Sequence, residues 1–160
     1  MKMHNPRTVR SALIASALVF ALAVPATAMA QSFTFKSTSN AQNMLGGDGK
    51  NGVPYSGGHW TGSSTGVMSD GTKTNTTFKC VMMTQPPRDS LFETHMLCDI
   101  VASNGTYSAT MGCQFVNPSA QEVSCIGGLY GTGGIYAGRR GSITNHAKGS
   151  ASTGTGQWFE

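Results

Sequence analysis

The sequence predicts an all-β fold: a single antiparallel β-barrel of about eight strands with disulfide-pinned hairpins, preceded by an N-terminal signal peptide. Three observations support this prediction. All 21 glycines follow residue 30, where they make up about 16% of the residues against a usual level near 7%. Between the glycine clusters, apolar and polar residues alternate as they do in half-buried strands. The four cysteines are arranged symmetrically about two turn-like segments.

Residues 1–30 have the three parts of a secretory signal peptide. A basic start is followed by an uncharged, apolar run over residues 11–24, and Ala28-Met29-Ala30 offers small side chains for cleavage before Gln31. The apolar run is shorter than the ~20 residues of a membrane-spanning helix. We therefore expect an exported protein, periplasmic or extracellular, with no membrane span after cleavage and one domain over residues 31–160. The alternative is a retained N-terminal anchor.

The expected mature domain is nearly neutral. It keeps eight of the eleven basic residues and all seven acidic ones, for a net charge of +1. Its one basic doublet is Arg139-Arg140. Because a nucleic-acid-binding domain normally carries a clustered basic patch, nucleic acid is not an expected partner.

The expected strands follow from the alternation of apolar and polar residues along the chain. In the four clearest runs the cysteines fall on the apolar side; these runs are residues 76–83, 91–101, 106–115 and 122–126. Shorter strands are expected at residues 33–35, 59–68, 135–137 and 141–146. Residues 43–58 have the composition of a Gly/Asn-rich loop, and residues 69–71 that of a turn. Residues 151–156 are too small and polar to fold alone, although Trp158-Phe159 could dock this tail.

The cysteines predict two disulfides in an exported protein. Each pair is centred on a turn-like segment: Cys80 and Cys98 on the one at residues 85–90, and Cys113 and Cys125 on the one at residues 117–121. Four cysteines allow three pairings, of which we prefer Cys80–Cys98 with Cys113–Cys125. Four free, buried thiols are the alternative.

A hairpin signal between the two pairs supports this choice. Asn104-Gly105 is typical of a two-residue turn with positive φ at both positions. With this dipeptide as the centre of a hairpin, Cys98 falls opposite Met111. A bridge from Cys98 to Cys113 is therefore out of register.

Residues 126–141 read Ile-Gly-Gly-Leu-Tyr-Gly-Thr-Gly-Gly-Ile-Tyr-Ala-Gly-Arg-Arg-Gly. This run resembles the signature near the end of allene oxide cyclase and dirigent-type barrels, where a Gly-Gly-x-Gly-x-aromatic-x-Gly segment leads into a final strand. It also resembles small exported bacterial proteins with the same glycine run. The resemblance, which extends over about residues 60–146, implies an eight-stranded antiparallel barrel in which the glycines make a tight corner between strands.

For function, the resemblance implies an apolar cavity used to cyclise a fatty-acid epoxide or to steer the coupling of phenols. The acidic and polar cavity residues of those families cannot be placed on this chain, and its cysteine-pinned hairpins depart from their pattern. No catalytic residue is therefore carried over.

The alternation itself predicts which side chains point into the barrel. Methionine and aromatic walls suit small apolar or phenolic molecules. The alternative is a solidly packed core, which small barrels also have. The candidate pocket residues are Phe78, Met82, Phe92, Met96, Tyr107 and Met111.

Chemistry outside the pocket has weaker support. Glu93, His95 and Asp99 share one strand face and are acid–base or metal candidates, although the same pattern is expected of a solvent-facing side. No histidine or cysteine has a zinc-like spacing, and the methionines fit an inward stripe better than a copper site. No nucleophile elbow or phosphate loop with its following helix is present. We expect no metal and no cofactor.

Three functions follow from these observations. The first is binding or steering of a small apolar or aromatic molecule without a cofactor. The second is a cofactor-independent isomerase or cyclase that uses the same cavity, as the resemblance to allene oxide cyclase implies. The third is a non-catalytic envelope interaction module with a solid core. The sequence leaves the ligand and the oligomeric state open.

Overall fold

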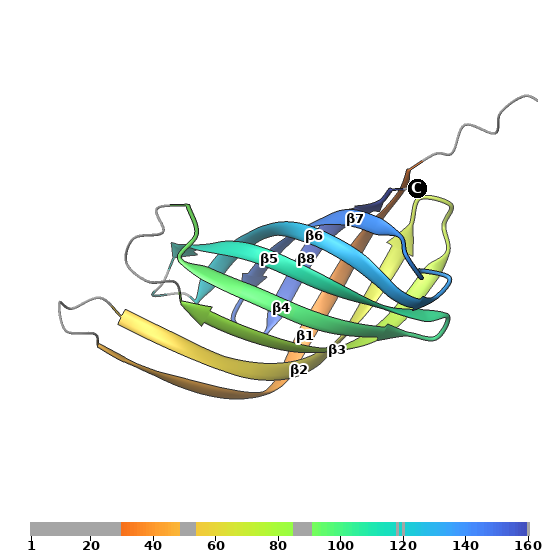
Figure 1. Cartoon of the computed structure of the whole chain (residues 1–160). Coiled ribbons are helices and arrows are strands. Elements are labelled where there is room, and N and C mark those ends of the chain that lie inside the picture. Colours follow the sequence, from red (N-terminus) through yellow and green to blue (C-terminus); the bar gives the residue numbers. More distant parts are fainter. Residues whose placement is uncertain (1–29, 49–53, 85–90, 118, 120, 160) are drawn as a thin grey trace, which may run out of the picture.

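The computed structural model describes residues 30–48, 54–84, 91–117, 119 and 121–159, and within them the chain forms a closed antiparallel barrel (Figure 1). Each strand pairs with the next along the chain, and the last pairs with the first. The predicted all-β barrel is confirmed. All but the last residue of the predicted signal peptide lies outside the described residues, as does the expected turn at residues 85–90. The strands are β1 (Gln31–Asp48), β2 (Pro54–Met68), β3 (Lys73–Thr84), β4 (Thr94–Ala102), β5 (Gly105–Asn117), β6 (Glu122–Gly134), β7 (Arg140–Lys148) and β8 (Ala151–Trp158).

The two ends of the barrel differ. At one end, which we call the base, lie the β2–β3 and β4–β5 turns, the β6–β7 connection and the end of β8. At the other end, the mouth, β1 and β2 run past the remaining strands (Figure 1). We call residues 42–48 of β1 and 54–60 of β2 the arm; within it, residues 57–60 still pair with β3. β1 leaves β8 at the pair Thr38–Ala151 and beyond it pairs with β2.

The arm corrects the prediction of a loop over residues 43–58 at residues 43–48 and 54–58, whereas residues 49–53 lie outside the described residues. Register pairs continue from Gln42–Trp60 to Asp48–Pro54. Backbone groups of glycine and asparagine pair in a ladder as well as those of other residues, although such segments lack the alternation by which a strand is recognised. A bulge between Ser39 and Gln42 interrupts the register, so the inward positions change from odd to even numbers.

β8 corrects the interpretation of residues 151–156 as a tail that cannot fold alone. This segment pairs with β7 on one side and with β1 on the other. Its inward positions are small because aromatic rings from β1 fill the space above them. A Cβ atom on Gly156 would overlap the Phe33 ring, and one on Gly154 the Phe35 ring. Trp158 does anchor the end of β8, with 2% of its surface exposed.

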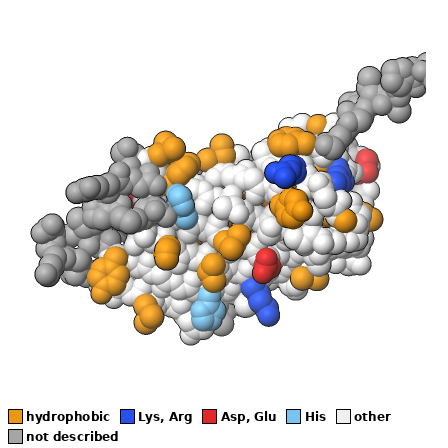
Figure 2. Space-filling model, in the orientation of Figure 1, with side chains coloured by type: hydrophobic (Ala, Val, Ile, Leu, Met, Phe, Trp, Pro, Cys, Tyr) orange, Lys and Arg blue, Asp and Glu red, His pale blue; other side chains and the backbone are white. Residues whose placement is uncertain are grey.

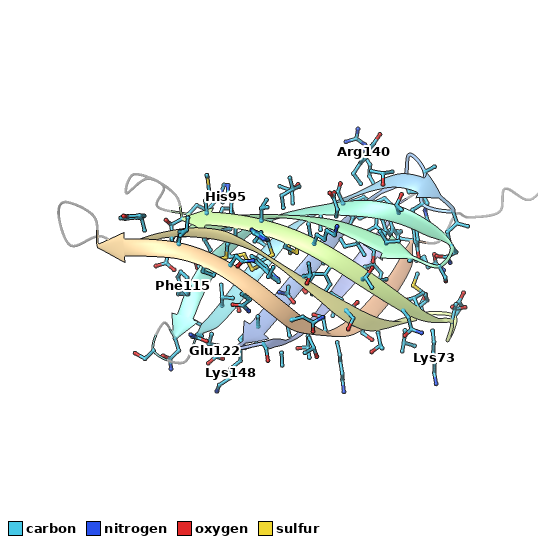
Figure 3. The ribbon with its side chains drawn as sticks, turned by 90° about the horizontal axis from the view of Figure 1, so that it is seen from below. Lys73, His95, Phe115, Glu122, Arg140 and Lys148 are labelled. Carbon is cyan, nitrogen blue, oxygen red and sulfur yellow. A yellow bond between two sulfur atoms is a disulfide. The ribbon has the colours of Figure 1, made fainter. Side chains whose placement is uncertain are left out.

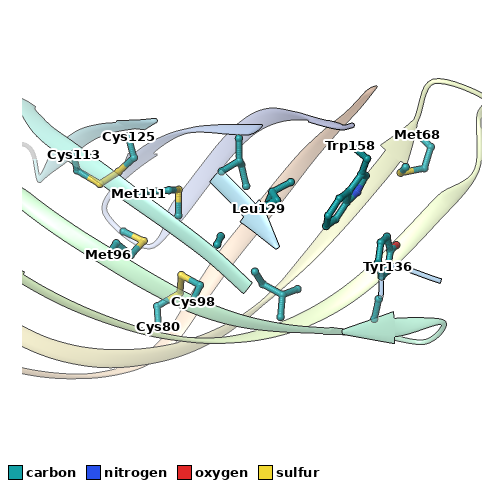
Figure 4. Close-up of a cluster of buried hydrophobic side chains, with 14 residues drawn as sticks. Met68, Cys80, Met96, Cys98, Met111, Cys113, Cys125, Leu129, Tyr136 and Trp158 are labelled. Atoms are coloured by element: carbon teal, nitrogen blue, oxygen red, sulfur yellow. A yellow bond between two sulfur atoms is a disulfide. The ribbon is translucent and has the colours of Figure 1, made fainter. Parts of the chain in front are cut away.

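Both predicted disulfides are confirmed. Cys80 is paired in register with Cys98, and Cys113 with Cys125. Their Cα atoms lie 4.1 Å and 4.0 Å apart, respectively. All four side chains point into the barrel, where each is less than 9% exposed, so the bridges tie β3 to β4 and β5 to β6 from the inside (Figure 4).

The β4–β5 turn is displaced from its predicted centre. Ala102 pairs with Gly105, so the two turn residues are Ser103 and Asn104 rather than Asn104 and Gly105. The β6–β7 connection docks on this turn, because the Ile135 N–H donates to the Asn104 carbonyl over 3.1 Å. Because the turn is centred one residue earlier than predicted, Cys98 lies opposite Ala109 and not Met111. Cys98 is still out of register with Cys113.

The glycine run makes the predicted corner between strands only in its last part, at the β6–β7 connection. Much of it lies within β6, and the positive φ values of this region are confined to Gly134 and Gly138, at 63° and 76°. Some of the other glycines allow close approach instead: a Cβ atom on Gly131 would overlap the Tyr136 carbonyl. Residues 135–137 therefore form no strand; they fold back over β6 and bury Tyr136.

Adjacent glycines of β6 provide a matched test of close approach. A Cβ atom on Gly127 would overlap the Thr110 carbonyl and lie 2.7 Å from the Met111 Cα atom, whereas one on Gly128 has its nearest neighbour at 3.8 Å. Backbone atoms cannot rotate away, so Gly127→Ala should lower the free energy of unfolding by about 1–3 kcal/mol or more. Gly128→Ala should change it by less than about 0.5 kcal/mol. Urea unfolding measures both, and equal effects would contradict the packing.

Removal of either disulfide tests its contribution to stability. The Cys80–Cys98 and Cys113–Cys125 bridges close loops with sequence separations of 18 and 12. Loops of this length correspond to about 3 kcal/mol each in the chain-entropy account. We expect replacement of either cysteine pair by alanine to lower the free energy of unfolding by about 2–4 kcal/mol, measured by guanidinium titration. A change below about 1 kcal/mol for both pairs would show that the bridges are dispensable.

Candidate functional site

The inside of the barrel contains a cavity of about 210 Å³ that extends towards the mouth. The β7–β8 turn and the first part of the arm, at Gln42 and Met44, contribute to its wall near this end. The rest of the wall comes from inward-facing side chains of all eight strands. The cavity is therefore a product of barrel closure and belongs to no single segment of the chain.

Sulfur atoms dominate one wall. Met82, Met96 and Met111 are register neighbours on β3, β4 and β5 and form what we call the thioether row. The Cys80–Cys98 disulfide lies next to it and also lines the cavity (Figure 4). Thioethers are polarizable and flexible, so this wall can adapt to apolar molecules of different shape.

A row of hydroxyl groups runs around the cavity from β3 through β2 and β1 to β8. Thr76, Ser64, Ser37 and Ser152 are register neighbours on β3, β2, β1 and β8, and we call them the hydroxyl row. Ser64 and Thr76 share a hydrogen bond of 2.8 Å, and Ser37 and Ser152 share another. In a closed ring of eight strands, β8 and β1 lie across from β4 and β5. Ser37 and Ser152 therefore lie across the ring from the strands of Met96 and Met111, whereas Thr76 shares β3 with Met82.

Asn145 adds a second polar group to this wall. Its side chain lines the cavity, and its Oδ1 atom is buried without a hydrogen-bond partner among the described residues. An unpaired buried amide oxygen carries a desolvation cost of about 1–3 kcal/mol. No Asp, Glu, Lys, Arg or His side chain lines the cavity. The wall is thus polar but uncharged.

Aromatic side chains close the base. The Tyr107, Tyr136 and Trp158 rings have centroids 5.0 to 5.2 Å apart, and Arg139 lies over the Trp158 ring at 5.4 Å. Figure 4 shows Trp158 and Tyr136 at the end of the core away from the two disulfides. Because this cluster fills the base, the mouth is the end by which a molecule could enter.

Burial perturbs the two tyrosines of the cluster. It raises the pKa of Tyr107 well above the ordinary tyrosine value, and the neighbouring Tyr136 raises it further. The pKa of Tyr136 is also raised by burial, against the opposing effects of Arg139 and of a hydrogen bond with Asn104. Both phenols therefore remain protonated, and neutral, in the folded protein.

Five of the six predicted pocket residues line the cavity: Phe78, Met82, Met96, Tyr107 and Met111. The structure differs for Phe92, which was expected to share their face. Phe92 precedes β4, and its ring lies over Gly112 and 5.7 Å from the His95 ring. Gly112 alternates with the inward-facing Met111 and Cys113, so Phe92 covers the outer wall. β4 begins at Thr94, after Phe92. The alternation of inward and outward side chains along β4 therefore does not extend to Phe92.

The acid–base candidates also lie on the outer wall. Glu93, His95 and Asp99 are exposed and alternate with buried residues of β4. His95 points away from the barrel (Figure 3), and Glu93 accepts a hydrogen bond from the Phe115 N–H over 2.6 Å. The structure does not bring these three side chains to the cavity.

One polar cluster had no sequence signal. On the outer wall of β6 and β7, Ser124 Oγ lies 2.8 Å from His146 Nδ1, and His146 Nε2 lies 3.0 Å from Glu122 Oε1. This order matches a nucleophile, a base and an orienting acid. Ser124 lies within the β6 ladder, however, paired in register with Gln114 and His146. Catalysis by such a serine needs backbone donors aimed at an oxyanion, and a ladder uses those donors for strand pairing. We assign this cluster to cross-strand pairing.

Trp60 and the hydroxyl row were likewise missed as cavity residues. Except for Thr76, which shares the alternation of Phe78 on β3, their inward direction depends on the register of β1, β2 and β8, which no local pattern reveals. Among the described residues, no group of three or more His, Cys, Asp or Glu side chains could hold a metal ion. Nor does that part of the chain contain a helix long and apolar enough to span a membrane.

No protein-family model matches the sequence, and no curated protein matches it at a significant level. The function must therefore be argued from the site itself.

The buried tyrosines predict a loss of stability in alkali. An unfolded tyrosine loses its proton near pH 10, whereas Tyr107 and Tyr136 keep theirs in the folded state. The unfolded state then binds fewer protons than the folded state, so the free energy of unfolding should fall as the pH rises above about 10. Tyr107→Phe should flatten this dependence in urea titrations between pH 8 and 11. An unchanged slope in the variant would contradict the burial of the Tyr107 phenol.

Proposed function

We propose that the barrel binds a small, uncharged, largely apolar molecule in its cavity without a cofactor. The observation that carries this proposal is the mixed, uncharged wall, which combines the thioether row with the hydroxyl row and the unpaired Asn145 amide. Such a wall suits an apolar or phenolic body with a hydroxyl or similar hydrogen-bonding group.

The size of the cavity is consistent with a ligand. A dry cavity of about 150 Å³ lined by apolar side chains accepts benzene, and this one measures about 210 Å³. A solidly packed barrel, on which the envelope-module hypothesis rests, would leave no such space. The cavity therefore favours binding over a module with a solid core.

The absence of charge in the wall narrows the ligand further. Transfer of an ionised group into a poorly solvated site is costly unless an opposite charge pairs with it. None of the residues that line the cavity carries a charge. A carboxylate could be accommodated if it remained at the mouth, whereas the part that enters the barrel should be neutral.

A second candidate is a cofactor-independent isomerase or cyclase, as a relationship to allene oxide cyclases would imply. It is supported by Tyr107, which borders the cavity and stays protonated, because a neutral phenol can donate a hydrogen bond to a reacting oxygen. The wall contains no carboxylate or imidazole to act with it, so binding is the better supported function.

Export is part of the same proposal. Two disulfides inside a barrel of this size are typical of proteins that fold in an oxidising compartment. The leader-like residues 1–30 support the same location, and both observations favour the periplasm or the medium as the place where the ligand is met.

A fluorescent probe tests binding in the cavity. N-phenyl-1-naphthylamine, which is neutral and fluoresces strongly in apolar surroundings, should bind to the oxidised protein purified from an exporting host. Ala147→Phe places a ring on the cavity wall near the mouth and should weaken binding at least about 10-fold, since an overfilled site excludes the probe.

Thr153→Phe is the matched control for this experiment. Thr153 lies on the exposed face of β8 beside the inward Ser152, so the same ring added there should leave the affinity unchanged. Absence of binding to the unaltered protein, or an equal loss in both variants, would contradict a cavity site. Mass analysis of the recovered probe distinguishes binding from chemical conversion.

A further inference from the structure

The outer wall of the barrel carries an apolar patch near the mouth. Its members are exposed side chains on neighbouring strands: Leu45 (81% exposed), Tyr55 (57%), Val81 (53%), Met83 (60%) and Leu97 (49%). Register pairs connect them through the sheet, from Leu45 through Gly57 to Met83 and from Val81 directly to Leu97. Figure 2 shows several hydrophobic side chains spread over this face, with one acidic and one basic side chain and histidines among them.

The patch is large enough to mark an interaction site. The exposed fractions of its five side chains correspond to roughly 500 Å² of apolar surface, the size at which a patch on a monomer often has a function. A standard interface buries about 800 Å² on each partner. The patch would supply the apolar centre of such an interface, and the polar residues around it the rim.

We infer that the partner is a second copy of this chain. The pair of charges at the border of the patch supports this choice: Lys79 on β3 lies in register with Asp99 on β4. A twofold axis parallel to these strands and between them places Lys79 against the partner's Asp99, and Asp99 against the partner's Lys79. Exchange of contacts in this way is the property of a twofold interface.

The same axis pairs the apolar residues. Val81 and Leu97 are register neighbours one step further along the same two strands, so Val81 comes to face the partner's Leu97. The arm extends this surface beyond the barrel with Leu45 and Tyr55.

Sedimentation velocity on the oxidised, exported protein tests the inference, at concentrations from about 5 to 500 μM. The unaltered protein should form dimers, and Met83→Glu combined with Leu97→Glu should weaken dimerisation at least 100-fold. Ile135→Glu is the matched control, because Ile135 is equally exposed, at 59%, but lies at the base. Its dimers should be unaffected.

A charge exchange tests the geometry of the dimer. Lys79→Asp places like charges against each other across the axis and should weaken dimerisation, whereas Lys79→Asp combined with Asp99→Lys should restore it. Urea unfolding of each variant shows that the barrel itself is intact. A monomer at 500 μM, equal weakening by Ile135→Glu, or failure of the exchanged pair to restore dimers would each overturn the inference.

Discussion

Closure of the sheet between β1 and β8 is the constraint on which the rest of the structure depends. Pairs from Gln31–Trp158 to Thr38–Ala151 join the first strand to the last. Without these pairs, both strands would present unpaired edges and the wall of the cavity would be open between β1 and β8. Closure at this point is possible because the inward residues of β8 are small where those of β1 are large. Gly154 and Gly156 lie beneath the rings of Phe35 and Phe33, respectively. The glycine content is thus a packing requirement as much as a turn requirement.

The sequence was sufficient to predict those features that depend on neighbouring residues within a single hairpin. In a hairpin the positions of two cysteines relative to a turn decide whether they meet, so the pairs Cys80–Cys98 and Cys113–Cys125 could be predicted without the fold. The inward direction of Met82, Met96 and Met111 follows from the same alternation. These predictions needed only the alternation of side chains along a strand and the position of a turn, and no contact between distant parts of the chain.

Prediction failed where structure depends on partners far along the chain. Residues 151–156 have no apolar face of their own and become a strand because β1, more than a hundred residues earlier, offers a free edge and two rings. The hydroxyl row is invisible in the sequence because its members belong to four different strands, which only closure brings together. The prediction for Phe92 was wrong for a different reason. β4 begins after Phe92, and side chains alternate between the two faces only within a paired strand.

The cavity and the apolar patch both follow from the way the arm is built. The bulge between Ser39 and Gln42 shifts the alternation of β1, so that Met44 turns towards the cavity while Leu45 turns outward onto the patch. Without the bulge, these directions would exchange, and the mouth would lose its apolar border on the inside. One inserted residue therefore connects the entrance of the proposed ligand site to the proposed interface. A protomer packed against the arm would hold that entrance in a single conformation, and affinity for the ligand would then depend on dimerisation.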